Sequence, residues 1–132
     1  MEITDILTPP KTIAVVGLSD KPKRPSYQVA SYLREHGFTI LPVNPMITEF
    51  LGLPAYPSLS AIPTKTHIDV VDIFRRSEEV SAIVQEVMNT GRQPIIWMQE
   101  GVISEDAKQL AETYGLQVIM DKCMMKVHQA LK

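Results

Sequence analysis

Apolar residues along the chain follow two different spacings. Short, β-branched apolar runs predict strands, and they fall at 12–17, 38–43, 68–74, 94–98 and 116–120. Apolar residues three and four positions apart predict helices, which cover 25–36, 78–90, 122–131 and a segment opened by Ser104. Pro25 suits the first position of its helix, and Ser77 and Ser104 are predicted N-caps. The chain therefore alternates between strands and helices.

Glycine marks the end of three predicted helices. Gly37, Gly91 and Gly115 each follow a helical segment and lead directly into an apolar strand. This order is typical of βαβ units, whose strands are parallel and whose helices cover both faces of a sheet. We therefore expect one α/β domain over residues 1–132, built on a mostly parallel sheet of five to six strands.

One long segment, residues 44–67, is rich in proline and lacks either spacing. It predicts one turn of helix around 47–51 and a short strand near Ala55 and Tyr56. Irregular connections of this length in small domains are often functional.

Composition narrows the class of protein. The 132 residues carry a formal charge of −2 and 45% apolar residues, which fits a soluble domain without the basic face of a general nucleic-acid binder. A single cysteine, Cys123, cannot form an internal disulfide. The start lacks a signal-peptide pattern, and no apolar run approaches the roughly 20 residues of a membrane span. We expect a cytoplasmic protein with neither nucleic acid nor membrane as partner.

Candidate ligand-binding residues follow the predicted strands, because open α/β sheets bind ligands beyond the carboxyl ends of their strands. The first strand runs into AVVGLSDKPKRPS, where Gly17 permits a tight turn and Ser19 adds a hydroxyl. Lys21, Lys23 and Arg24 then precede a helix start, which favours an anion. The loop suits a phosphate-bearing ligand and equally suits a solvated basic turn, since one glycine is weaker than a full G-x-G-x-x-G.

The next strand ends argue against NAD. An NAD site normally places an acidic residue after the second strand, whereas this chain has Asn44 and Pro45 there. Asn44 has the groups to hydrogen-bond an adenosine or a pantetheine amide, although the spacing alone favours a simple turn. Arg75 and Arg76 follow the third strand and precede a predicted helix. Cations at a helix start are electrostatically unfavourable, so their presence there favours a role in binding a ligand.

Residues with catalytic chemistry are not grouped in the sequence. His36, His67 and His128 are scattered without metal-ligand spacing. Asp69 and Asp72 stand three apart in one strand and so point to opposite faces. We expect neither a metal site nor catalytic residues.

Several stretches together resemble the stand-alone bacterial CoA-binding proteins. These share the CoA-binding Rossmann-like domain of the succinyl-CoA synthetase α subunit and of ADP-forming acyl-CoA synthetases. The matching stretches are AVVGLSDKPKRPSYQVASYL (14–33), LPVNP (41–45), LG with AYPSLSAIP (51–63), VVDIFRRSEEV (70–80), IIWMQEGV (95–102) and VIMDKCMMKVH (118–128). Lys122 and Val127 stand where this family has a basic residue, often arginine, and an acidic residue.

The resemblance implies a Rossmann-like, doubly wound sheet with coenzyme A at the carboxyl ends of its strands. The diphosphate and 3′-phosphate end is expected at Gly17, Ser19, Lys23, Arg24, Ser26 and Tyr27. Val43, Asn44 and Pro45 are expected to flank the adenosine, and Phe74, Arg75 and Arg76 to cover the next strand end. Gln99 and Gly101 are expected to approach the pantetheine arm.

Two classes of function remain open at this point. The first is a non-catalytic protein that binds, senses or carries CoA or an acyl-CoA, because 132 residues leave no room for the phosphohistidine and nucleotide domains of the larger relatives. The second is a small NAD(P)- or CoA-dependent enzyme, or one subunit of a split acyl-CoA synthetase. A third, redox interpretation has Cys123 form a mixed disulfide with the CoA thiol.

Overall fold

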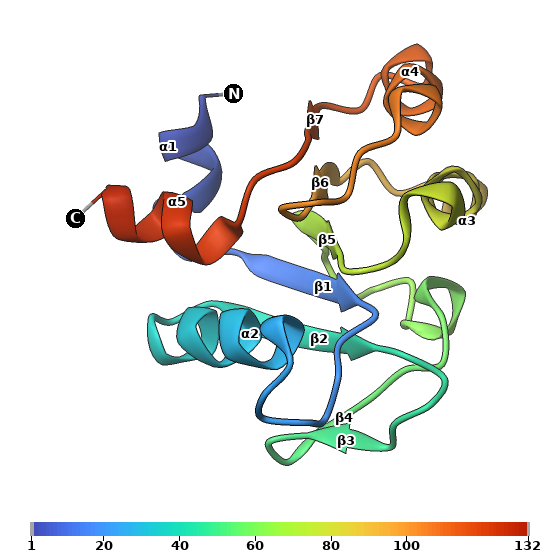
Figure 1. The fold of residues 1–132 in the computed structure, drawn as a ribbon. Helices are drawn as coiled ribbons and strands as arrows, with labels where there is room; N and C mark the ends of the chain where they lie inside the picture. Colours follow the sequence, from blue (N-terminus) through green and yellow to red (C-terminus); the bar gives the residue numbers. More distant parts are fainter. Residues whose placement is uncertain (1, 132) are drawn as a thin grey trace.

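A sheet of five parallel strands runs through the middle of the molecule (Figure 1). The computed structural model describes residues 2–131. The strands are β1 (Thr12–Val16), β2 (Thr39–Val43), β5 (Val70–Ile73), β6 (Ile95–Met98) and β7 (Val118–Ile119), in the spatial order β2-β1-β5-β6-β7. Numbered among themselves these strands follow the order 2-1-3-4-5, a doubly wound arrangement that confirms the expected Rossmann-like α/β class.

Helices cover both faces of this sheet (Figure 1). On one face lie α1 (Ile3–Leu7), α2 (Pro25–Glu35) and α5 (Met124–Ala130), and on the other lie α3 (Val80–Thr90) and α4 (Glu105–Thr113). In β1, Ile13 and Val15 pack toward the first set of helices, while Ala14 and Val16 pack toward the second. All four are buried, as expected for a parallel strand with helices on both sides.

Two of the predicted helix starts are confirmed and one is wrong. Pro25 is the first residue of α2, and the Ser104 hydroxyl accepts a hydrogen bond from the Ala107 N–H at 3.1 Å. Ser77 does not cap α3, because a 3₁₀ turn, η2 (Ser77–Glu79), precedes that helix. The Ser77 hydroxyl instead accepts from the Ile103 N–H at 2.9 Å, which ties η2 to the loop after β6.

The irregular segment contains a β-hairpin, so the predicted turn of helix around 47–51 is wrong. Strands β3 (Glu49–Phe50) and β4 (Leu53–Pro54) pair antiparallel. Between them Leu51 and Gly52 both have positive φ, of 49° and 82°, the conformation that tight hairpin turns require. The expected short strand near Tyr56 is present as a single parallel bridge to Val43. A 3₁₀ turn, η1 (Leu59–Ala61), follows.

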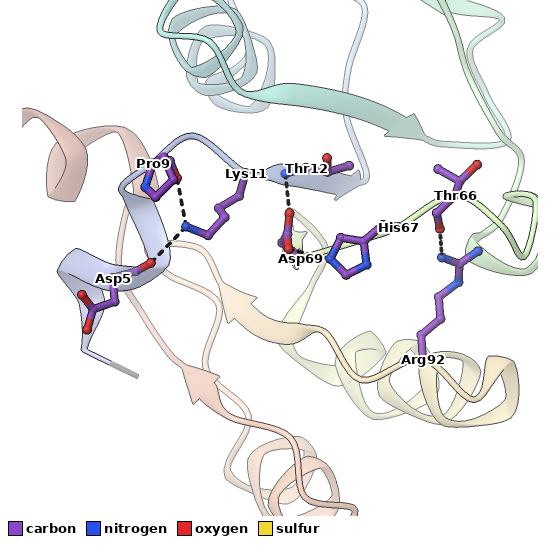
Figure 2. A network of polar contacts seen from close by, with 8 residues as sticks. All are labelled: Asp5, Pro9, Lys11, Thr12, Thr66, His67, Asp69 and Arg92. Carbon is purple, nitrogen blue, oxygen red and sulfur yellow. Dashed lines mark hydrogen bonds and ion pairs between the residues drawn. The ribbon is translucent and has the colours of Figure 1, made fainter.

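Polar contacts close the amino-terminal end of the sheet (Figure 2). The Asp69 carboxylate accepts from the Thr12 N–H at 2.8 Å, which joins the start of β1 to the residue preceding β5, and it contacts His67 Nε2 at 2.7 Å. The Arg92 guanidinium donates to the Thr66 carbonyl just outside this end of the sheet. These contacts are structural, and they lie at the end opposite the expected ligand site.

Asp72 is a buried carboxyl in the middle of the sheet. Its side chain shares a face with Val15 and Trp97, its register partners on the neighbouring strands. It is fully buried, and among the described residues neither carboxyl oxygen has a hydrogen-bond partner. Burial raises the pKa of Asp72 well above its ordinary value, because the charged form of the carboxyl would lose its hydration inside the sheet.

Two of the three histidines lie together, although their sequence positions suggested no grouping. The rings of His36 and His128 have centroids 5.3 Å apart, and the Tyr32 hydroxyl lies 2.7 Å from His128 Nδ1. This aromatic cluster joins α2 to α5, while His67 lies apart at the amino-terminal end of the sheet. Within residues 2–131 no group of three or more potential metal ligands occurs, and no helix is long and apolar enough to span a membrane.

Candidate functional site

A cleft of about 930 Å³ lies at the carboxyl ends of the strands. It crosses the point where the strand order reverses between β1 and β5, the usual ligand position in open α/β sheets. Its lining residues are Gly17, Ser19, Asp20, Lys21, Arg24, Pro25, Ser26, Val29, Asn44, Met46, Ile47, Phe74, Arg75, Arg76, Gln99, Glu100, Val102 and Cys123. This cleft, called the main cleft below, is lined by residues that follow β1, β2, β5 and β6. Cys123, in the connection from β7 to α5, also lines it.

At Gly17 the loop between β1 and α2, called the first loop below, packs against the end of β5. Its φ is +86°, and a β-carbon at this position would lie 2.3 Å from the Phe74 carbonyl oxygen and 2.8 Å from Arg75 Cδ. Its N–H donates to the Val43 carbonyl at 2.8 Å. The protein's own packing therefore requires glycine at position 17, whether or not a ligand approaches it.

Two serine hydroxyls shape the loop between β1 and α2. The Ser26 hydroxyl, at the start of α2, accepts from the Ser19 N–H at 2.9 Å. The Ser19 hydroxyl accepts in turn from the Lys21 N–H at 3.0 Å. These bonds fold the loop over the first turn of α2 and hold Lys21 and Arg24 at the edge of the cleft.

Asn44 connects the loop after β2 to the loop after β1. Its amide Nδ2 donates to the Leu18 carbonyl at 3.0 Å, and its Oδ1 accepts from the Met46 N–H at 2.8 Å. This geometry places Met46 and Ile47 on the wall of the cleft, where Met46 is 84% exposed. Asn44 is therefore a turn residue that also lines the cleft, and its hydrogen bond to an adenosine or a pantetheine amide stays a prediction.

The cleft is positively charged in a chain whose formal charge is negative. Its lining carries four basic side chains, from Lys21, Arg24, Arg75 and Arg76, against two acidic ones. Arg75 and Arg76 share the Glu79 carboxylate, at 2.6 Å from Arg75 Nη2 and 2.9 Å from Arg76 Nε. Hydrogen bonds from these two arginines lower the pKa of Glu79 to about 2, so the carboxylate stays ionised at physiological pH.

The far end of the cleft is formed by the ends of β6 and the start of α5. The buried Gln99 side chain accepts from the Met124 N–H at 3.1 Å. The indole of Trp97, which is fully buried, donates to the Lys122 carbonyl at 2.8 Å. Both contacts hold Cys123 at the cleft. Glu100 on the rim pairs with Lys126 at 2.9 Å, which raises the pKa of Lys126.

A second, smaller cleft of about 480 Å³ lies on the α3 side of the sheet. It is lined by Val16, Val43, Pro45, Pro57, Ser58, Arg75, Glu78, Glu79, Ala82, Ile83 and Glu86. Arg75 lines both clefts. Its side chain therefore lies where the two clefts approach each other.

Most sequence-predicted site residues come together in the main cleft, and five do not line it. Those in the cleft are Gly17, Ser19, Arg24, Ser26, Asn44, Phe74, Arg75, Arg76 and Gln99. Val43 and Pro45 line the second cleft instead. Lys23 is exposed outside both, and Tyr27 packs edge-on against Phe50 with ring centroids 5.1 Å apart. The Gly101 N–H is bound by the Asp121 carboxylate at 2.7 Å.

Lys21 and Cys123, which the sequence placed in the basic loop and in the redox interpretation, also line the cleft. No such indication came from the sequence for the other lining residues, which are Asp20, Pro25, Val29, Met46, Ile47, Glu100 and Val102. Val29 was detectable, because it lies one helical turn after Pro25 and Ser26 and so shares their face of α2. Met46 and Ile47 had no such signal, since the fold of the irregular segment was not predicted.

The lining of the main cleft combines basic side chains with apolar ones such as Val29 and Ile47, a combination that accommodates an anionic ligand with apolar groups. Cys123 is the only strong nucleophile among the described lining residues, and no histidine lines either cleft within residues 2–131. A nucleophile with its base is therefore missing from the described part of the site.

Comparisons with known proteins agree with this geometry. A family model described as a CoA binding domain matches residues 11–129. The chain is 43% identical to the Bacillus subtilis (strain 168) protein YneT over 131 residues, which cover 99% of this chain and 95% of that protein. A hypothetical protein from Pyrococcus horikoshii OT3 has a structure with a TM-score of 0.90 and 38% identity, covering 98% of this chain and 89% of the other.

A larger protein also matches. The α subunit of the ADP-forming acetate–CoA ligase II of Pyrococcus furiosus is 28% identical over 132 residues, which cover 92% of this chain. The match covers only 29% of that subunit. The chain is therefore similar to one part of this ligase subunit.

Proposed function

The chain belongs to the family of CoA-binding domains, and from that membership we propose that it binds coenzyme A or an acyl-CoA in the main cleft. The observation that carries the proposal is the position of four basic side chains at the switch point of the sheet, in a chain of net negative charge. Coenzyme A bears a diphosphate and a 3′-phosphate, and clustered cations are what such a ligand requires. A cleft of about 930 Å³ also lies at the upper end of ordinary ligand-site volumes.

The ligand's orientation follows from the residues along the cleft. The loop from Gly17 to Ser26 and the start of α2 receive the phosphates, because loop N–H groups and a helix N-terminus favour anions. The adenosine lies by Asn44 and extends toward Val43 and Pro45 in the second cleft. The pantetheine arm runs toward Gln99 and Cys123. Lys23, Tyr27 and Gly101 line neither cleft and remain predicted contacts.

The proposed role is non-catalytic binding, as in a carrier or sensor of CoA. The absence of a nucleophile–base pair among the described lining residues supports this. A second candidate is a subunit of a split acyl-CoA synthetase. The observation in its favour is the match to part of the Pyrococcus furiosus ligase α subunit, which shows that chains of this type also occur within ligase subunits.

A thermal-unfolding panel tests the proposed ligand. Purified protein is heated with CoA, acetyl-CoA, dephospho-CoA, NAD and NADP, each in large excess. A ligand at one hundred times its Kd stabilises the native state by about 2.7 kcal/mol, which corresponds to a rise in Tm of about 10 °C for a chain of this size. We expect that rise with CoA and a smaller one with dephospho-CoA. A rise with NADP and none with either CoA form contradicts the proposal.

The two candidate roles separate in a second assay. A subunit of a split ligase is expected to bind a partner chain when it is mixed with lysate of its own organism and CoA, and the complex forms acyl-CoA from acid, CoA and ATP. A carrier binds CoA as tightly alone as in that mixture and elutes unchanged in size. Formation of acyl-CoA that depends on added protein favours the ligase subunit.

A further inference from the structure

Arg75 borders both clefts. It lines both, and its Cδ packs so closely on Gly17 that a β-carbon there would lie 2.8 Å away. Its aliphatic stem is therefore fixed against the first loop, while its guanidinium extends to the side of the second cleft. A ligand that crosses from one cleft to the other passes this guanidinium.

Glu79 holds that guanidinium from the side of the second cleft. Its Oε2 lies 2.6 Å from Arg75 Nη2, in a pair whose side chains are 36% and 26% exposed. Its other oxygen contacts Arg76 Nε at 2.9 Å, but the Arg76 side chain is 78% exposed. Ion pairs of fully exposed side chains add little order, so the contact with Arg75 is the one that fixes a side chain.

We propose that Glu79 is a positioning residue of the ligand site, which fixes Arg75 on the border of the two clefts so that Arg75 meets the phosphates of a ligand lying across both. This inference rests on the proposed binding of CoA. Glu79 itself does not contact the ligand; it acts through Arg75.

Two effects of Glu79 on an anionic ligand oppose each other. Its charge repels phosphate, and because both anions would contact Arg75 they lie within the Debye length of about 8 Å at 0.15 M salt, so salt weakens this repulsion only in part. Its contact with Arg75 removes the need to order a long side chain when the ligand binds, and such ordering weakens binding several-fold for each side chain. The positioning role requires the ordering effect to exceed the repulsion at physiological salt, and the repulsion grows as salt is lowered.

The experiment is a double-mutant cycle read by calorimetric titration with CoA at 0.15 M salt. The variants are Glu79→Gln, Arg75→Ala and both together, and the cycle separates an action through Arg75 from an independent one. Glu112→Gln is the matched control: it also removes one carboxylate from an i,i+4 pair, with Lys108 at 4.0 Å on α4, away from both clefts.

Glu79→Gln is expected to weaken CoA binding about fivefold in the otherwise unchanged protein, and less than twofold in the Arg75→Ala background. The loss is also expected to shrink at 0.02 M salt, which a general loss of folding would not produce. Glu112→Gln is expected to bind CoA as the unchanged protein does. An equal loss in both backgrounds, or tighter binding by Glu79→Gln at 0.15 M salt, overturns the positioning role. If the unchanged protein binds no CoA, the proposed function fails and the inference fails with it.

Discussion

The buried carboxyl of Asp72 is expected to lower the unfolding free energy of this protein as pH rises. The substitution Asp72→Asn tests this pH dependence. Asp72 lies in β5 with both oxygens unpartnered among the described residues, and burial raises its pKa. Asp72→Asn keeps the size of the side chain and removes its ability to ionise. The difference in unfolding free energy between the two proteins therefore isolates the titration of this one group.

The sign and size of the effect follow from proton linkage. Between the ordinary pKa of 3.8 in the unfolded chain and the raised pKa of the native state, the native protein holds the proton more tightly. Its unfolding free energy then falls as pH rises, by at most about 1.4 kcal/mol per pH unit. The contribution is fully present below pH 3.8 and is lost as pH rises through the raised pKa. Because Asn does not ionise, the unfolding free energy of Asp72→Asn does not fall with pH for this reason.

Chemical denaturation between pH 4 and 8 measures the effect. The two proteins are expected to be within about 1 kcal/mol at pH 4, and the Asn variant is expected to gain relative stability as pH rises toward the raised pKa of Asp72. Asp72→Val, which removes both polar oxygens, is expected to be more stable than the unchanged protein at pH 7 by about 1–3 kcal/mol. Parallel pH profiles for the unchanged protein and Asp72→Asn would refute the reasoning, because they would mean that folding leaves the pKa unchanged.

Two further substitutions test local features of the fold. Gly17→Ala places a β-carbon 2.3 Å from the Phe74 carbonyl oxygen at a φ of +86°, so the unfolding free energy is expected to fall by about 3 kcal/mol in urea denaturation; a loss below about 0.5 kcal/mol would mean that the loop yields without strain. Ser104→Ala removes the acceptor of the Ala107 N–H and is expected to lower the unfolding free energy by about 1 kcal/mol. CoA affinity should stay the same, and a changed affinity would speak against a purely local cap.

The type and order of an element could be predicted from the sequence where its apolar pattern follows directly from which residues are buried. Strands β1 and β5 and helix α2 carry apolar patterns that match their burial, so their type and order were predictable. The hairpin of β3 and β4 was not, because it depends on left-handed conformations at Leu51 and Gly52 that no periodicity signals. Ser77 looked like a cap, but a hydrogen bond from a distant loop, at Ile103, occupies its hydroxyl.

The site was predictable as far as strand order places residues side by side. Residues directly after strands, such as Asn44 and Arg75, line clefts as strand-end reasoning implies. Long-range packing decides the rest. Tyr27 turns toward Phe50 instead of the cleft, and Gly101 gives its N–H to Asp121, a residue with a positive φ of 61°. Such pairings join residues far apart in the chain and leave no local pattern.

The most direct measurement is calorimetric titration of the protein with CoA and with dephospho-CoA, for the unchanged protein and for Arg24→Ala. Arg24 lines the main cleft and precedes α2, so it is the cation best placed to meet a phosphate at the helix start. The account predicts CoA binding that is at least tenfold tighter than dephospho-CoA binding, with most of that difference lost in Arg24→Ala. Absence of CoA binding by the unchanged protein at low salt would contradict the central claim.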